Sequence, residues 1–306
     1  MNINKQLQWF LLLIIWGILQ TGCADSPYDT DGPQLVVEGW IDAGGHPIVF
    51  VTTSLPFTST DKNQTDFSSH ILNWAKVTVS DGEQTVVLTG RVMRNYPIPY
   101  GFTTGQMRGQ VGKTYKLTVD YADYHAQAIT TIPHPCPIDS FRYALLTKAD
   151  TLFELRAYAS HLNLPTGGAC KFFVMRRGKD KHYLSCNMGL FAAQAVSPHA
   201  VFPVLQGHRL RNGKHDKYSP YFSTSDTLLV KFATLDAAAY RFWKSYEENL
   251  SLSSSPFFGS ANALQGNING ALGYWCGYGT QEYVFGPIAP RGTQKSKKRT
   301  TAKLKT

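Results

Sequence analysis

The chain has 306 residues, 43% of them hydrophobic and 13% aromatic, a composition that excludes general disorder and a length that favours about two domains. Its net charge of +9 is concentrated at the ends, because seven basic residues fall in the last 16 positions and Lys5 lies near the start. The remainder carries 22 basic and 21 acidic residues, so overall charge gives no support to a nucleic-acid-binding protein.

The first 23 residues have the organisation of a bacterial export signal. Residues 1–8 carry Lys5 and no acid, and residues 9–19 form an apolar stretch too short to span a bilayer as a helix. It runs into "LQTGC" (19–23), which resembles a lipobox, where a peptidase cuts before a lipid-modified cysteine. We expect a lipoprotein signal peptide over 1–22 and an acylated Cys23 that anchors the chain to a membrane. The alternative is an ordinary signal peptide followed by an unmodified cysteine.

Residues 23–33 are polar and rich in Asp, Ser, Pro and Gly, as expected of a tether behind a lipid anchor. Residues 34–132 then alternate short strand patterns with turn signals. The clearest examples are "LVVEGWI" (35–41), "PIVFVTT" (47–53), "KVTVS" (76–80) before Asp81-Gly82, and "TYKLTVDY" (114–121). Repeated strands of this kind predict an immunoglobulin-like β-sandwich over 34–132.

Three prolines in "IPHPCPIDS" interrupt this pattern, and because proline cannot join a central sheet we expect a linker at 133–138. Residues 139–287 are predicted to form a second β-rich domain with one packed helix at about 236–250. Asp236 is its expected N-cap, and Tyr240, Phe242 and Trp243 are expected to pack rather than to bind a ligand. Residues 288–306 are expected to be a basic disordered tail, with contact to anionic lipid or polysaccharide as the alternative.

Four cysteines remain once Cys23 is assigned to the lipid, namely Cys136, Cys170, Cys186 and Cys276. In an exported chain they permit two disulfides in three connectivities. Cys170 and Cys186 lie equally far from Gly178, so a hairpin centred there would place them opposite each other, close enough for a bridge. We predict a Cys170–Cys186 disulfide, which leaves Cys136 with Cys276. Four buried reduced thiols are the alternative.

No pattern in the sequence points to catalysis. The nine histidines lack the spacing of metal ligands, and no G-x-S-x-G elbow supplies a hydrolase nucleophile. The glycines of "GYWCGYG" (273–279) do not have the pattern of a phosphate-binding loop, and no run of repeated acids forms a calcium loop. We therefore expect a protein without enzymatic activity, cofactor, metal or nucleic-acid partner.

Several segments taken together resemble one family. They are the lipobox cysteine, "LVVEGWI", "GKTYKLTV", "TIPHPCPIDS" and above all "YRFWKSYEENL" followed by "SPFFGSANALQGNINGALGYWCGYG". This set is similar to the domain-of-unknown-function family numbered 4249, which is associated with outer-membrane lipoproteins of Bacteroidota. The resemblance covers residues 23 to about 287. It implies an outer-membrane location and an accessory role beside TonB-dependent transporters, and it supplies no functional residues.

Two functions of different classes remain. The first is a lipid-anchored protein that captures a ligand or nutrient for a TonB-dependent transporter, which predicts an aromatic-lined groove or an exposed apolar face near the boundary of the two domains. The second is a structural or adhesion-type envelope module that binds other proteins, which predicts a flat patch without a concave site.

Overall fold

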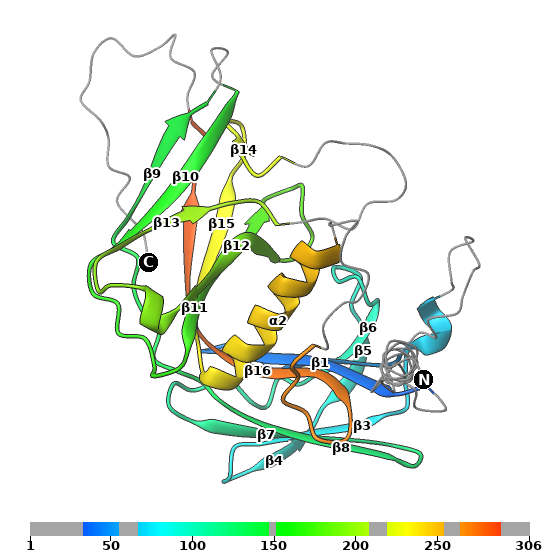
Figure 1. Ribbon diagram of the computed structural model, residues 1–306. Helices are drawn as coiled ribbons and strands as arrows, with labels where there is room; N and C mark the ends of the chain where they lie inside the picture. The colour runs from blue at the N-terminus through cyan, green and yellow to red at the C-terminus, as the bar shows by residue number, and fades with distance from the viewer. Residues whose placement is uncertain (1–32, 55–66, 147–150, 208–218, 254–263, 289–306) are drawn as a thin grey trace, which may run out of the picture. The chain divides into compact units, whose positions relative to one another are not determined.

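The computed structural model describes residues 33–54, 67–146, 151–207, 219–253 and 264–288, and within them the chain forms three β-sheets and one α-helix (Figure 1). The predicted mainly β class with one helix is therefore confirmed. The described helix, α2 (Ala237–Ser253), is not long and apolar enough to cross a membrane. Cys23, the signal peptide and nearly all of the tether and basic tail lie outside the described residues.

The largest sheet, called the long sheet, has eight strands in the order β12-β11-β15-β16-β1-β2-β6-β5. The four strands from the first part of the chain are β1 (Leu35–Asp42), β2 (Ile48–Thr53), β5 (Thr89–Val92) and β6 (Tyr100–Thr103). The four from the second part are β11 (Ala169–Arg176), β12 (Leu184–Ala192), β15 (Leu228–Leu235) and β16 (Leu272–Phe285).

Each half of the long sheet is covered on one face by a four-stranded sheet. The first cover sheet has the order β4-β3-β7-β8 and consists of β3 (Lys76–Ser80), β4 (Thr85–Val87), β7 (Thr114–Tyr121) and β8 (Tyr124–Thr131). The second contains β9 (Ser140–Leu145), β10 (Leu152–Ala159), β13 (Ala200–Val204) and β14 (Phe222–Ser223). Two short 3-10 helices, η1 (Phe67–His70) and η2 (Ala193–Ala195), connect strands.

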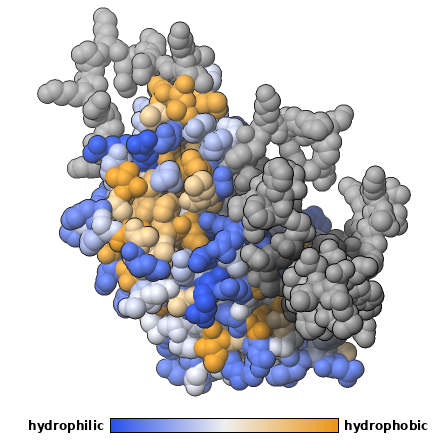
Figure 2. Space-filling model, viewed as in Figure 1, coloured by the Kyte–Doolittle hydropathy of each residue, from blue (hydrophilic) through white to orange (hydrophobic). Residues whose placement is uncertain are grey.

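These layers form two sandwiches, each with its own hydrophobic core. Strict alternation in β1 sends Leu35, Val37 and Ile41 into the first core, as the sequence pattern predicts. The second core lies between β11, β15 and the second cover sheet, and Phe172 and Phe232 pack there with ring centroids 4.6 Å apart. On the side shown in Figure 2, hydrophobic residues also reach the surface over β9, β10 and β13, where Val201 is 51% exposed.

Strand β16 joins the two sandwiches, so the boundary predicted at 133–138 does not separate two sheets. β16 pairs with β15 on one side and runs parallel to β1 on the other, with Val36 opposite Leu272. The proline-rich segment is packed rather than a free linker, since the Cys136 amide donates to Thr234 Oγ1 at 3.2 Å and the Ile138 amide donates to the Tyr283 hydroxyl at 2.7 Å. From Leu35 onward the chain forms one compact unit.

Trp275 of β16 completes the first core from the far end of the sequence. Its side chain is fully buried, and its indole Nε1 donates a hydrogen bond to the Tyr115 carbonyl at 3.0 Å. Gly39 on the neighbouring strand makes room for the ring, because a Cβ there would lie 2.9 Å from it. The C-terminal strand is thus an internal part of the sandwich that the N-terminal residues begin.

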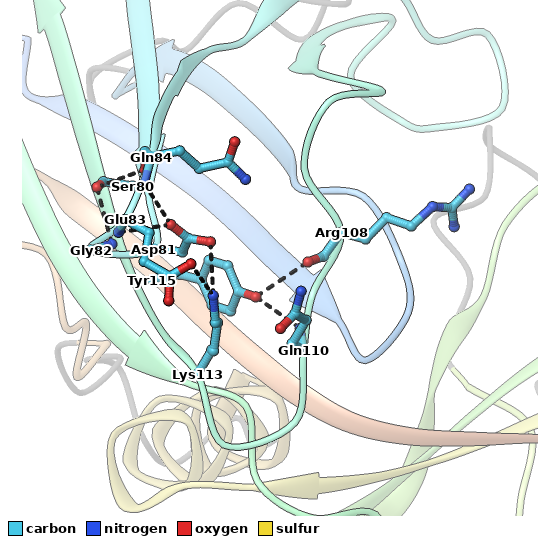
Figure 3. A network of polar contacts seen from close by, with 9 residues as sticks. All are labelled: Ser80, Asp81, Gly82, Glu83, Gln84, Arg108, Gln110, Lys113 and Tyr115. Carbon is cyan, nitrogen blue, oxygen red and sulfur yellow. Dashed lines mark hydrogen bonds and ion pairs between the residues drawn. The ribbon is translucent and has the colours of Figure 1, made fainter.

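Tyr115 also ties the first sandwich together at its edge, in a polar network shown in Figure 3. Its hydroxyl donates to the Arg108 carbonyl at 3.2 Å and accepts from the Gln110 amide at 2.8 Å, an arrangement like the tyrosine corner of immunoglobulin-like domains. Next to it, Asp81 closes the predicted β3–β4 turn by accepting from the Gln84 amide at 2.9 Å. Lys113 makes ion pairs with this turn, 3.4 Å from Asp81 and 3.1 Å from Glu83.

Candidate functional site

The face of the long sheet that the cover sheets leave bare carries the best candidate site, and we call it the open face. In β1 it is the face of Glu38, Trp40 and Asp42, the residues that alternate with the core positions. Helix α2 packs over part of this face, on β12, β15 and β16 (Figure 1). The part beyond the helix is where the two sandwiches meet.

Helix α2 is held to the open face by aromatic packing around a buried lysine. Phe242 and Trp243 are buried against the sheet, which confirms for both the prediction that they pack. Lys171 of β11 is fully buried, with its ammonium 2.7 Å from Glu247 of the helix and 4.5 Å from the centre of the Trp243 ring. Burial lowers the pKa of Lys171. Asp236 caps the helix as predicted, accepting from the Ala239 amide at 2.8 Å.

Beyond the helix, side chains from both sandwiches meet in a group that we call the junction cluster. It combines ring-bearing and charged residues from six separate segments of the chain. Its members are Trp40, Asp42, Phe50, Tyr96, His182, Tyr183, Lys231 and Glu282.

The aromatic part of the junction cluster is a continuous set of rings. Tyr96 lies 5.9 Å from Trp40 and 5.4 Å from Phe50, measured between ring centroids. The His182 imidazole stacks on Tyr96 at 5.5 Å, and its Nδ1 lies 2.7 Å from the Asn95 carbonyl, which fixes the orientation of the ring. His182 comes from the β11–β12 hairpin, so this contact links the second sandwich to the loop between β5 and β6 of the first.

The charged part is centred on Lys231 of β15. Its ammonium lies 2.5 Å from Asp42, 3.8 Å from Glu282 and 4.7 Å from the centre of the Tyr183 ring. Asp42 belongs to the first sandwich and Lys231 to the second, so this ion pair also crosses the junction. Burial, reinforced by the charge of Glu282, raises the pKa of Tyr183 above its ordinary range, and the phenol therefore stays protonated as a hydrogen-bond donor.

A shallow cavity of about 410 Å³ opens beside the rings. Its walls are mainly apolar, with polar groups at the edge, and are formed by Ile48, Val92, Met93, Arg94, Asn95, Tyr96 and Thr103. All of these residues belong to the first sandwich, and Tyr96 is the one that the cavity shares with the junction cluster. The junction cluster has the components of a binding surface. Ring faces can stack on a ligand, phenol hydroxyls can donate hydrogen bonds, and the lysine is already neutralised by carboxylates.

The sequence analysis did not single out this group. Each member is an unremarkable residue in its own segment, and only the pairing of distant strands brings them together. The one available signal was in β1, where "EGWID" places Glu38, Trp40 and Asp42 on the face opposite the core.

The disulfide prediction is wrong in its register. The β11–β12 hairpin does turn at Gly178, which has a positive φ of 75°, but extra residues in β12, where Met188 has a positive φ of 49°, shift the pairing further along. As a result Cys170 lies opposite Phe191, and Cys186 does not face it. The sequence offered no signal for this irregularity.

All four described cysteines are buried free thiols: Cys136, Cys170, Cys186 and Cys276. The other predicted pair is also wrong, because Cys136 belongs to the second core whereas Cys276 packs with α2 on the opposite face of the long sheet. Burial raises the pKa of the Cys186 thiol to about 12, and it raises the pKa of Cys276 further. Thiols in this state are protonated and unreactive at neutral pH.

Three histidines outside the junction cluster make local contacts. His46 bonds the Met107 carbonyl at 2.7 Å, and His70 bonds Thr53 Oγ1 at 2.9 Å. His125 pairs with Asp120 at 2.6 Å on the adjacent strand. Across the described residues, no three His, Cys, Asp or Glu side chains gather in a group that could hold a metal ion.

Comparison with known proteins identifies the family. No curated protein matches the chain. Residues 24–283 match the family described as Domain of unknown function (DUF4249), and this range contains helix α2, the junction cluster and both sandwiches except the last two residues of β16. Because the match covers most of the chain, the protein is a member of the DUF4249 family.

Proposed function

We propose that this protein is a non-enzymatic outer-membrane lipoprotein, anchored through Cys23, that captures a ligand for a TonB-dependent transporter. The observation that carries the proposal is the junction cluster with its cavity. An aromatic-lined surface near the boundary between the two halves is what a ligand-capturing protein of this design requires.

The chemistry of the cluster favours a ligand with flat or ring-shaped groups. Tyr96 lines the cavity and stacks on His182 beside it, and stacking suits sugar rings and the side chains of peptides. Lys231 is already paired with Asp42, so it offers no free charge to a strongly acidic ligand. Nutrients with ring-shaped groups are therefore the class that the junction cluster favours.

The transporter association is tested by pull-down of the tagged full chain from native outer membranes, followed by mass spectrometric identification of partners. We expect a TonB-dependent barrel to be recovered with the protein. Repeated recovery without any barrel would contradict the proposal. A Cys23→Ser variant is expected to lose stable anchoring, and an amount of membrane-bound protein equal to that of wild type after a high-salt wash would contradict the lipid anchor.

Ligand binding is tested by Trp40 fluorescence while soluble oligosaccharides and short peptides are titrated as probes. Tyr96→Ala removes a stacking ring, so the affinity for any probe that binds is expected to fall about three- to tenfold. Tyr143→Ala is the matched control, because Tyr143 is 47% exposed and belongs to β9, outside the cluster. Equal losses in both variants would remove the cluster as the site.

A second candidate function is a structural or adhesion-type module that binds other envelope proteins. It is favoured by the hydrophobic surface over β9, β10 and β13 seen in Figure 2, where Val201 and Leu146 are 51% and 42% exposed. Val201→Glu would abolish protein partners of this surface and leave probe binding at the junction cluster unchanged. Loss of transporter recovery in this variant alone would favour the second candidate.

A further inference from the structure

The end of the first sandwich where the chain enters its sheet carries an unusual set of surface residues. Leu35 is the first residue of β1 and lies opposite Thr53 of β2. The Thr53 hydroxyl in turn contacts His70 Nδ1 at 2.9 Å. A tight turn over 72–75 follows, closed by a hydrogen bond from the Ala75 amide to the Leu72 carbonyl at 3.4 Å. We call this region the entry end.

Trp74 projects from that turn and is 91% exposed. Leaving a tryptophan side chain in water costs more free energy than leaving most other side chains there, because its large ring exposes much apolar surface. Its neighbours in the turn, Leu72 and Ala75, are buried in the first core, so the turn is rigidly attached to the sandwich. The exposure of Trp74 is therefore set by the fold.

Other apolar and aromatic residues share the entry end. Leu272, the first residue of β16, pairs with Val36 next to the chain entry and is 39% exposed. The tip of the β7–β8 hairpin carries Tyr121 and Tyr124, which are paired with each other and half-buried. Strand pairing places this tip at the same end, because Lys76, two residues after Trp74, lies opposite Asp120 of β7 (Figure 1).

We infer that the entry end is a membrane-contacting surface, with Trp74 inserted into the headgroup region of the bilayer that holds the acyl chains of Cys23. This inference rests on the lipid anchor of the proposed function. Tryptophan and tyrosine are the side chains that favour the membrane–water interface, because each combines an apolar ring with a polar group.

The short segment between Cys23 and the sheet favours a lipid bilayer as the partner of this surface. Twelve peptide units separate Cys23 from Leu35, and even a fully extended chain spans no more than roughly 40 Å over that distance. Chain length therefore limits how far Leu35, and with it the entry end, can lie from the anchored cysteine. Membrane contact through Trp74 would hold the body in one orientation, which a tether alone cannot do.

Tryptophan fluorescence tests the contact directly in the full, lipid-modified chain. Once the leader is removed, four tryptophans remain, and Trp243 and Trp275 are buried. The protein is reconstituted on phosphatidylethanolamine–phosphatidylglycerol vesicles whose acyl chains carry bromine, which quenches rings that enter the bilayer. We expect quenching that is lost in Trp74→Phe and retained in Trp40→Phe. Equal quenching in wild type and Trp74→Phe would overturn the inference.

A second measurement separates the contact from the anchor. The full chain with Cys23→Ser is sedimented with the same vesicles at about 0.5 M salt, which screens the basic residues of positions 291–306. Trp74→Ala is expected to lower the partition coefficient about tenfold, as loss of a partly buried aromatic ring implies. Val201→Ser, at an exposed site in the second sandwich, is the control and is expected to change nothing.

The outcomes distinguish the two proposals. Mass spectrometry that finds Cys23 without lipid would overturn the anchor, whatever Trp74 does. A lipid-modified protein in which Trp74→Ala and Val201→Ser partition equally would overturn the membrane-contacting surface and leave the anchor standing.

Discussion

The two faces of the long sheet are built by the same strands and yet have different surroundings. On the covered face, Leu35, Val37 and Trp275 are almost completely buried in a dry core. On the open face the alternating positions of the same strands carry Glu38 and Asp42, and α2 and the junction cluster shield different parts of this face. The covered face determines whether the protein folds, whereas the open face can vary its chemistry at little cost to the core.

The largest loss of stability is expected from a substitution on the covered face. Trp275→Ala would empty the centre of the first core, and the free energy of unfolding is expected to fall by about 3–5 kcal/mol, as in other large-to-small core substitutions. Urea denaturation followed by circular dichroism measures the change. Trp74→Ala removes the same side chain from an exposed site and is expected to cost less than about 0.5 kcal/mol. Similar losses of unfolding free energy in the two variants would contradict the burial of Trp275 and the exposure of Trp74.

The buried ion pair under α2 tests how the open face tolerates charge. Glu247→Ala leaves the fully buried Lys171 without its partner, so we expect a loss of about 2–3 kcal/mol, less than for a wholly buried pair because Glu247 is 25% exposed. Lys171→Met replaces the lysine with an apolar chain of similar length and is expected to be neutral or stabilising. Thermal denaturation of both single variants and the double variant gives the coupling. A larger loss in Lys171→Met than in Glu247→Ala would contradict this account.

Two carboxylates are expected to give opposite pH dependences. The backbone hydrogen bond from Gln84 lowers the pKa of Asp81 in the first cover sheet, so its stabilisation is present above the unfolded pKa and is lost as the pH falls. Burial raises the pKa of Glu38 on the open face, so its ionisation destabilises the fold as the pH rises above the unfolded value. Asp81→Asn should cost about 0.5–1 kcal/mol at neutral pH, whereas Glu38→Gln should increase stability there.

Unfolding curves for wild type and both variants, measured between about pH 3 and neutral pH, check the direction of each pH dependence. The advantage of wild type over Asp81→Asn is expected to shrink as the pH falls below the unfolded pKa of Asp81, and the advantage of Glu38→Gln is expected to be lost below the unfolded pKa of Glu38. A Glu38→Gln variant less stable than wild type at neutral pH would contradict the burial of that carboxyl.

The smallest expected effect concerns the cysteines on the two faces. Because burial raises the pKa of Cys186 to about 12 and also raises that of Cys276, neither thiol is expected to react with iodoacetamide in the native protein. Mass spectrometry should find both labelled only after unfolding, without prior reduction. A Cys170–Cys186 peptide in a non-reducing digest would contradict the free thiols.

Local features of the fold were predictable from sequence, and long-range ones were not. The alternation in 35–41 and 114–121, the Asp81-Gly82 turn and the Asp236 cap are each encoded within a few residues, and the structure confirms them. The pairing of β1 with β16 depends on contacts between the two ends of the folded chain, for which one sequence contains no signal. A single irregularity in β12 was enough to defeat the disulfide geometry.

The candidate site was unpredictable for the same physical reason. Six segments supply the junction cluster, and its key contacts join residues such as Asp42 and Lys231 that are far apart in the chain. Periodicity places Trp40 and Asp42 on the non-core face of β1 but does not identify what else lies there. The ligand-capture hypothesis predicted aromatic residues near the boundary of the two halves. Only the structure could identify which residues these are.

The position of β16 also sets an order of events during synthesis. Residues 34–132 contain all but one of the strands that enclose the first core, yet the indole that fills its centre is the side chain of residue 275. A nascent chain that has left the ribosome only as far as α2 has an open slot between β15 and β1. Long-range pairing of this kind slows folding, because the loop between β8 and β16 must close before the first core is complete. Synthesis of β16 is therefore the step after which the first sandwich can reach its native core.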